Sequence, residues 1–189
     1  MKKIPTIFKR NPRRDRRQEV LPEQNPECAW VFKGEGVATR KYDGTCCLVK
    51  DKKLWKRREV KRGKPTPSDF VPLEHDPVTG KTVGWVPVDA NDKSDRWHIE
   101  AFADMTVIED GTYELCGPKV QGNPEGCSAH TLIPHAKAQQ YPNVPRTFEG
   151  IRDFLADTIG YLDIEGLVFH HPDGRMAKIK TRDFGLRRP

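Results

Sequence analysis

The apolar residues of this chain occur in short runs separated by glycine, proline or aspartate, and this pattern limits what the chain can fold into. The runs are rich in valine, tryptophan, cysteine and leucine, which favours strands over helices. The strand predictions cover residues 29–32, 45–50, 54–60, 82–88 and 112–116.

A clear helical period occurs in one segment near the C-terminus. Apolar residues recur every three or four positions between Thr147, the expected N-cap, and Gly160, the expected stop. Residues 164–169 and 176–180 flank a His-His-Pro-Asp-Gly turn and predict a hairpin. Residues 65–80, with four prolines, predict a loop, while residues 96–105 fit a helix or a strand. The class is α+β, rich in antiparallel sheet. The predicted core residues are Leu48, Leu54, Leu115, Ile164, Leu167 and Phe169.

Composition narrows the class of protein. The 189 residues suit one domain of ordinary size, and no apolar run is long enough to span a bilayer. No apolar stretch follows the N-terminal lysines and arginines as in a secretory signal, so we expect a cytoplasmic protein without membrane contact. Five cysteines, two of them adjacent, do not form a disulfide framework. The residues Cys116, Cys127, His130 and His135 lack the spacing of a zinc site and are expected to be structural.

The positive charge is concentrated in two segments. The chain carries a net charge of +6, and residues 1–17 hold eight basic residues against one acidic residue. Residues 50–64 hold nine basic residues against two acidic ones. We therefore expect a polyanionic partner, a basic arm over residues 1–26 and a folded domain over residues 27–189. The alternative is that the arm is a solvated tail without a task. The candidate contacts to such a polyanion within the arm are Arg13, Arg14, Arg16 and Arg17.

One set of charged residues suggests nucleotide chemistry. Lys41 and Gly44 lie in a Lys-Tyr-Asp-Gly-Thr sequence between two predicted strands. A deprotonated lysine is a nucleophile, neighbouring cations lower its pKa, and a glycine lets the backbone approach a phosphate. Glu114 and Glu165 offer carboxylates for a ribose and a metal. Lys178 and Lys180 alternate on one strand face and suit phosphate, although such a pair is more often simply an exposed face.

The order of these segments resembles the covalent nucleotidyltransferases, which include ATP- and NAD-dependent polynucleotide ligases and mRNA capping enzymes. Five segments carry the likeness to motifs I, Ia, III, IV and V: Lys41-Tyr42-Asp43-Gly44, Arg57, Thr112-Tyr113-Glu114-Leu115, Glu165-Gly166-Leu167-Val168 and Lys178-Ile179-Lys180. Further segments resemble the vertebrate-type 5′ to 3′ RNA ligases and their microbial or viral relatives: Gly84-Trp85-Val86-Pro87-Val88, Trp97-His98, Gln121-Gly122-Asn123-Pro124, Ile133-Pro134-His135 and Phe184-Gly185-Leu186.

The resemblance implies a ligase-type adenylylation domain with antiparallel sheets around an ATP cleft. Lys41 would attack the α-phosphorus of ATP and form a lysine–AMP intermediate. Glu114 would bind the ribose, while Glu165 and Asp43 would hold Mg²⁺ or Mn²⁺. The implied ATP-binding set is Thr39, Lys41, Asp43, Gly44, Arg57, Glu114, Glu165, Lys178 and Lys180. Arg58 is the alternative to Arg57, and His135 is a candidate adenine contact.

The predicted function is an ATP-dependent RNA ligase that joins 5′-phosphate and 3′-hydroxyl ends of RNA. The position that is often Arg in DNA ligases is Cys46 here, which disfavours a DNA ligase. Because Lys180 lies nine residues before the last residue, no OB-fold is expected to follow it. We expect a monomer and no protein partner. The alternatives are an enzyme that only activates or caps an RNA end and a non-catalytic RNA-end binding protein.

Overall fold

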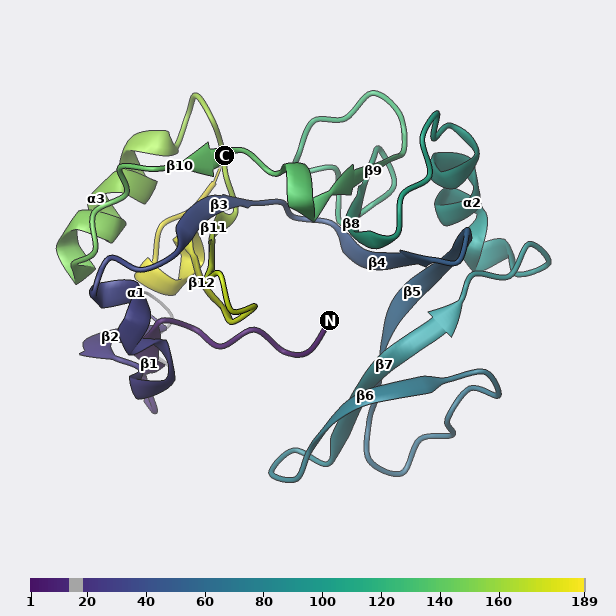
Figure 1. Cartoon of the computed structure of the whole chain (residues 1–189), viewed down its shortest axis with the longest axis horizontal. Helices are drawn as coiled ribbons and strands as arrows, with labels where there is room; N and C mark the ends of the chain where they lie inside the picture. The colour runs from purple at the N-terminus through teal and green to yellow at the C-terminus, as the bar shows by residue number, and fades with distance from the viewer. Residues whose placement is uncertain (14–18, 189) are drawn as a thin grey trace. The chain divides into compact units, whose positions relative to one another are not determined.

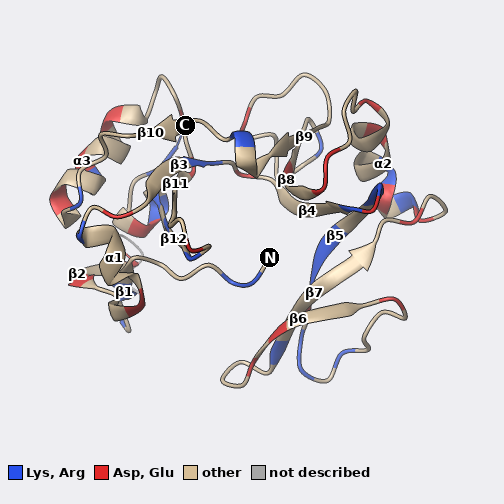
Figure 2. Cartoon of the chain, viewed as in Figure 1, with Lys and Arg blue, Asp and Glu red and all other residues tan. Residues whose placement is uncertain are grey.

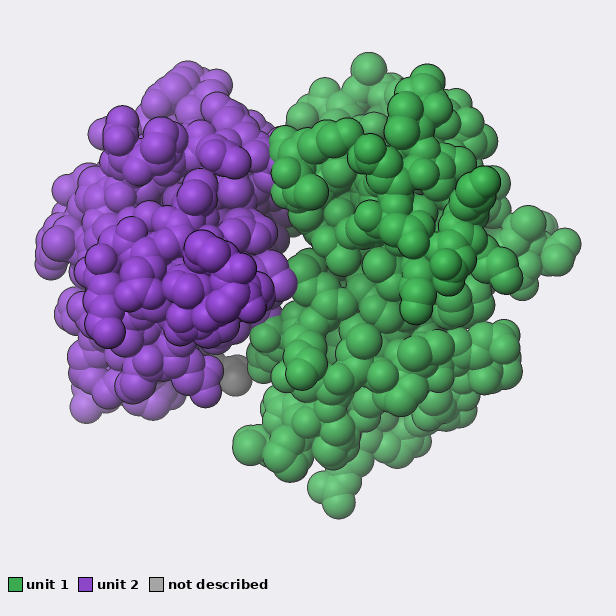
Figure 3. Space-filling model, viewed as in Figure 1, with its two compact units in different colours: residues 1–3, 43–137 green, residues 4–42, 138–189 purple. Residues whose placement is uncertain are grey.

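The computed structural model describes residues 1–13 and 19–188. The chain divides into two compact units, which Figure 3 colours separately. Unit 1 contains residues 1–3 and 43–137, and unit 2 contains residues 4–42 and 138–189. Within the described ranges, no helix has the length and apolar character that crossing a bilayer requires.

Unit 1 is built on an antiparallel sheet of six strands in the order β6-β7-β5-β4-β8-β9 (Figure 1). The strands are β4 (Thr45–Lys50), β5 (Lys53–Val60), β6 (Val71–Asp76), β7 (Lys81–Pro87), β8 (Gly111–Cys116) and β9 (Thr131–Pro134). The helices are α2 (Arg96–Ala103) and the 3-10 turns η2 (Lys93–Asp95) and η3 (His135–Lys137). The strand predictions for 45–50, 54–60, 82–88 and 112–116 are confirmed within one residue or two, and the ambiguous segment 96–105 is a helix.

One face of this sheet forms the core of unit 1. Cys47 and Val49 of β4 pack with Tyr113 and Leu115 of β8 and with Ala101 of α2. The predicted core residues Leu54 and Leu115 are buried, whereas Leu48 is half-buried, so its prediction is wrong. Side chains alternate along a strand, and β4 uses its odd-numbered positions for the core. The prediction of a continuous loop over 65–80 is also wrong, because β6 pairs with β7 along the edge of the sheet. An edge strand tolerates Pro72, which lacks a backbone N–H.

Unit 2 contains a four-stranded sheet in the order β10-β3-β11-β12 and a separate two-stranded sheet, β1-β2. The strands are β1 (Phe8–Arg10), β2 (Val20–Gln24), β3 (Val37–Lys41), β10 (Gln140–Tyr141), β11 (Gly166–His170) and β12 (Met176–Lys180). The helices are α1 (Ala29–Phe32), α3 (Phe148–Thr158) and the 3-10 turns η1 (Pro26–Cys28) and η4 (Thr181–Phe184).

The predicted helix and hairpin of unit 2 are confirmed. The Thr147 hydroxyl caps α3 by accepting a hydrogen bond from the Gly150 amide, and the helix ends two residues before Gly160. Strands β11 and β12 pair in register from Gly166↔Lys180 to His170↔Met176. The predicted core residues of this unit, Ile164, Leu167 and Phe169, are all buried.

Two predictions for unit 2 are wrong. Residues 29–32 form the short helix α1 instead of a strand, following η1, which Asn25 caps and Pro26 begins. The described part of segment 1–26 is folded instead of forming a loose arm. Ile7 and Phe8 are buried in the core, and the Phe8 ring lies 4.9 Å from the ring of Phe148 between centroids. The prediction failed because it followed the many basic residues of this segment and gave no weight to the few apolar residues among them.

Candidate functional site

Four predicted site residues lie on one face of the unit 2 sheet. Lys41 and Lys180 are both register partners of Gly166, from opposite sides of β11. Two positions further along, Thr39 and Lys178 both lie opposite Val168. Residues directly opposite one another in a sheet share a face, so the structure brings these side chains together. The other face is the apolar core, with Ala38, Leu167 and Ile179 among its members.

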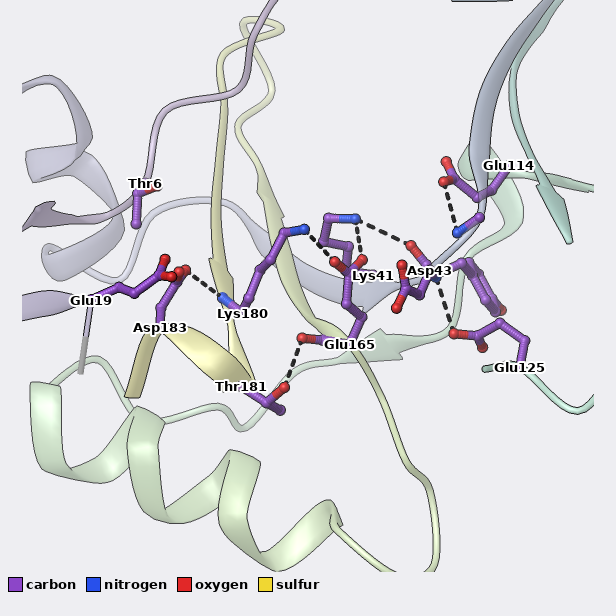
Figure 4. Close-up of polar contacts among 12 residues, drawn as sticks. Thr6, Glu19, Lys41, Asp43, Glu114, Glu125, Glu165, Lys180, Thr181 and Asp183 are labelled. Atoms are coloured by element: carbon purple, nitrogen blue, oxygen red, sulfur yellow. Dashed lines mark hydrogen bonds and ion pairs between the residues drawn. The ribbon is translucent and has the colours of Figure 1, made fainter. Parts of the chain in front are cut away.

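Glu165 joins the lysines of this face (Figure 4). One oxygen of its buried carboxylate accepts a hydrogen bond from the Lys41 ammonium, and the other accepts one from the Lys180 ammonium. Gly166 allows this convergence, since a Cβ there would lie 2.1 Å from the Ile179 carbonyl oxygen. Burial alone would raise the pKa of Glu165, but the positive charges of Lys41 and Lys180 outweigh burial and lower it. Glu165 is therefore ionised at neutral pH and holds two ammonium groups.

Lys178 adds a third ammonium group to the same face. Burial, reinforced by the charges of Lys41 and Lys180, lowers the pKa of Lys178 to about 8. Thr39, on the other side of β11, donates its hydroxyl proton to the Val168 carbonyl oxygen and lies 3.1 Å from His170 Nε2. Two of the three lysines contact Glu165 and the third lies near it, so this face carries excess positive charge and suits an anion such as a phosphate.

In unit 1, Glu114 is held from both sides. Its Oε1 accepts a hydrogen bond from the Gly44 amide at 3.1 Å, and its Oε2 lies 3.0 Å from His135 Nε2. The other ring nitrogen of His135 lies 3.0 Å from the Thr112 hydroxyl. Gly44 is required here because a Cβ would lie 2.1 Å from the Leu115 carbonyl oxygen of β8. The sequence did not indicate the pairing of His135 with Glu114, since the residues lie 21 positions apart.

Asp43 and Arg57 complete the predicted residues in unit 1. The Asp43 amide donates to Glu125, a carboxylate that the sequence motifs did not indicate (Figure 4). The register of β4 with β5 and β8 puts Arg57 and Glu114 on the same face of the sheet and Arg58 on the opposite face. Arg57 Nε donates to the Met1 carbonyl oxygen at 3.3 Å.

The remaining candidate residues belong neither to the contacts around Glu165 nor to those around Glu114. Of the four predicted RNA-binding arginines, Arg13 is exposed, and Arg14, Arg16 and Arg17 lie outside the described residues. His130 is buried, lies 2.8 Å from Glu100 through Nδ1 and accepts the Lys119 amide through Nε2, which are structural contacts. Among the residues that the structure describes, no three His, Cys, Asp or Glu side chains are grouped so as to hold a metal ion.

The fold and these contacts describe an α+β protein in which clustered lysines and carboxylates offer a site for an anionic ligand. A comparison with models of protein families finds no match. The chain is similar to proteins named RNA ligase 1 from Rattus norvegicus (29% identical) and Pongo abelii (27%), each over 79% of this chain and 67% of that protein. The Danio rerio protein of the same name is 25% identical over 81% of this chain and 68% of its own length. The chain is therefore a relative of the RNA ligase 1 proteins.

Proposed function

We propose that this protein is an ATP-dependent RNA ligase that forms a covalent lysine–AMP intermediate at Lys41. The single observation that carries the proposal is the contact of Lys41 and Lys180 with the two oxygens of Glu165, beside Lys178. A nucleophile for phosphoryl chemistry needs a fixed position and positive charge near the developing anion. This cluster provides both, and the relatives named RNA ligase 1 make RNA the expected substrate.

The proposed reaction has three steps. The Lys41 ammonium first gives up a proton to water, and its neutral Nζ attacks the α-phosphorus of ATP. An N–P bond forms, the bond to the leaving pyrophosphate breaks, and the nitrogen releases a second proton to water. The AMP then passes to the 5′-phosphate of an RNA and regenerates the lysine. Finally a 3′-hydroxyl attacks the activated phosphate, a phosphodiester forms, and AMP leaves. Lys178 and Lys180 would neutralise charge on the phosphates, and Glu114 would accept hydrogen bonds from the ribose hydroxyls.

The other parts of the proposal follow the sequence resemblance. They include the nucleotidyltransferase type of fold, an RNA substrate with 5′-phosphate and 3′-hydroxyl ends, and a cytoplasmic monomer. The proposed nucleotide contacts also include Thr39, Asp43, Gly44 and Arg57. A divalent metal at Glu165 and Asp43 does not fit the present arrangement, since both oxygens of Glu165 contact ammonium groups. No step of the proposed reaction therefore passes through a metal.

Transfer of label from α-labelled ATP to the protein tests the proposal. The wild-type chain should become labelled in a denaturation-resistant form, and Lys41→Ala should abolish labelling while the thermal unfolding midpoint stays close to that of the wild type. Labelling of that variant at the wild-type level would overturn the assignment of Lys41. Labelling without joining of RNA ends would favour an end-activating enzyme, and no labelling at all would favour a non-catalytic binder.

A further inference from the structure

The N-terminal segment covers the edge of β12 that does not pair with β11. Thr6 forms a parallel bridge with Lys178, so residues 5–7 run beside β12, the strand that carries Lys178 and Lys180. The Lys178 amide donates to the Pro5 carbonyl oxygen at 2.9 Å, and the Ile7 amide donates to the Lys178 carbonyl oxygen at 3.0 Å. Both the N–H and the carbonyl group of Lys178 are thus bound by this segment, while β11 pairs with β12 along the other edge of the strand.

A second connection holds Lys180. Asp183 in η4 is fully buried, and its Oδ2 accepts a hydrogen bond from the Lys180 amide at 3.0 Å (Figure 4). Its Oδ1 accepts one from Arg10 Nη1 at 2.8 Å. Arg10 also pairs with Glu19 at 2.8 Å and donates from Nη2 to the Thr6 hydroxyl at 3.0 Å. The Glu19 amide in turn donates to the Asp183 carbonyl oxygen at 3.0 Å.

Arg10 therefore connects the two attachments. It neutralises a carboxylate that lies at the end of β12 and binds Thr6, the residue that bridges to Lys178. A buried carboxylate that loses its cation must move or take up a proton. Either change would disturb the turn that begins at Lys180, and with it the ammonium group on Glu165.

We propose that Arg10 is a positioning residue for the phosphate-facing lysines, acting through Asp183 on Lys180 and through Thr6 on Lys178. This inference rests on the proposed function, because it concerns the rate at which Lys41 reacts with ATP. The N-terminal basic segment then has a task within the adenylylation site that does not require RNA.

The test compares Arg10→Ala, Arg10→Lys and the control Lys9→Ala in the full chain, without RNA. Lys9 precedes Arg10 in the same strand, and its ion pair with Glu23 is exposed. We would measure the single-turnover rate constant of labelling at saturating ATP, the labelling amplitude and the KM for ATP. The rate constant does not depend on the folded fraction, whereas the amplitude does.

Arg10→Ala should lower the rate constant at least about tenfold, because ångström-scale misplacement of reacting groups costs up to about 100-fold. Arg10→Lys should recover part of the rate, and Lys9→Ala should match the wild type. A lowered amplitude with an unchanged rate constant would reduce Arg10 to a folding role and overturn the proposal. Absence of labelling in the wild type would instead refute the proposed function, so the two failures are distinguishable.

Discussion

The carboxylates Glu165 of unit 2 and Glu114 of unit 1 are held in opposite ways. Glu165 contacts two ammonium groups and lies near a third lysine. Glu114 contacts a backbone amide and a histidine ring. In the first arrangement one carboxylate pairs with two ammonium groups, and the positive charge in excess of that carboxylate can bind an anion. The second leaves a carboxylate whose remaining lone pairs suit neutral donors such as hydroxyl groups. The Lys-Tyr-Asp-Gly motif contributes to both arrangements, since the Lys41 ammonium contacts Glu165 and the Gly44 amide contacts Glu114.

Replacing Glu165 should break the first arrangement and give the largest effect. In Glu165→Gln the amide cannot neutralise Lys41 and Lys180, so the two ammonium groups repel each other and lose their positions. We expect labelling at saturating ATP to slow by about 100-fold or more, with a smaller change in ATP affinity. Single-turnover labelling and calorimetric titration with ATP measure the two quantities, and Glu23→Gln, in an exposed ion pair, is the control. Lost affinity with an unchanged saturated rate would make Glu165 a binding residue only.

Removing His135 tests the second arrangement, in which Glu114 contacts the Gly44 amide and the His135 ring. In His135→Ala, Glu114 keeps the Gly44 amide but loses the ring that fixes its Oε2. A hydrogen bond to a charged group contributes about 1.5–3 kcal/mol, so we expect the KM for ATP to rise roughly tenfold or more. The preference for ATP over 2′-deoxy-ATP or 3′-deoxy-ATP should fall as well, while the saturated labelling rate changes little. A variant that keeps the full preference would show that His135 does not hold Glu114 in position for the ribose.

The pH dependence of ATP capture should identify the contribution of Lys178. With a pKa of about 8, this lysine is charged below pH 8 and loses its charge as the pH rises. The kcat/KM for ATP reports the free enzyme and should therefore decline above about pH 8, by up to about tenfold per pH unit. Lys178→Arg keeps its charge and should move the decline to higher pH. An identical profile in both proteins would mean that another group controls the alkaline limb.

The sequence predicted the regular parts of the fold from local patterns. Strands β4, β5, β7, β8, β11 and β12 and helix α3 follow from alternation, turn residues and the Thr147 cap. The local pattern failed where neighbouring segments decide the structure. Residues 29–32 are apolar enough for a strand, yet the preceding Asn25 cap and Pro26 start helical turns. In β6, pairing with β7 overrides four prolines in the surrounding segment.

The site was predictable only in part for a similar reason. Alternation along β12 predicted that Lys178 and Lys180 share a face, and the structure adds Lys41 and Thr39 to it. The partners of the predicted residues could not be read from the sequence. Arg10 and Asp183 lie 173 positions apart, and His135 and Glu114 lie 21 apart. These contacts depend on tertiary packing, which spacing along the chain does not reveal.

The folded N-terminal segment changes how the predicted RNA contacts must be tested. Deleting residues 1–17 would remove Ile7 and Phe8 from the core, at a cost of roughly 1.5–3 kcal/mol each, and would also remove Arg10. Charge must therefore be changed without truncation. The variant replaces Arg13, Arg14, Arg16 and Arg17 with Gln. A comparison variant replaces three exposed residues that follow β5, Lys61, Arg62 and Lys64, with Gln; Figure 2 shows further lysines and arginines in this basic segment.

Neither variant should alter labelling by ATP alone, since each retains Arg10 and the lysines around Glu165. If the arginines of residues 13–17 bind RNA, replacing them should weaken end joining. It should also reduce the slope of log affinity against log salt by up to about 0.7 for each RNA phosphate that the variant no longer neutralises. RNA titrations at several salt concentrations measure this slope for both variants and the wild type. A reduced slope confined to the Lys61, Arg62 and Lys64 variant would place the RNA-binding surface on unit 1. It would leave residues 13–17 without a role in RNA binding, whereas Arg10, four residues after Thr6, would keep its separate task.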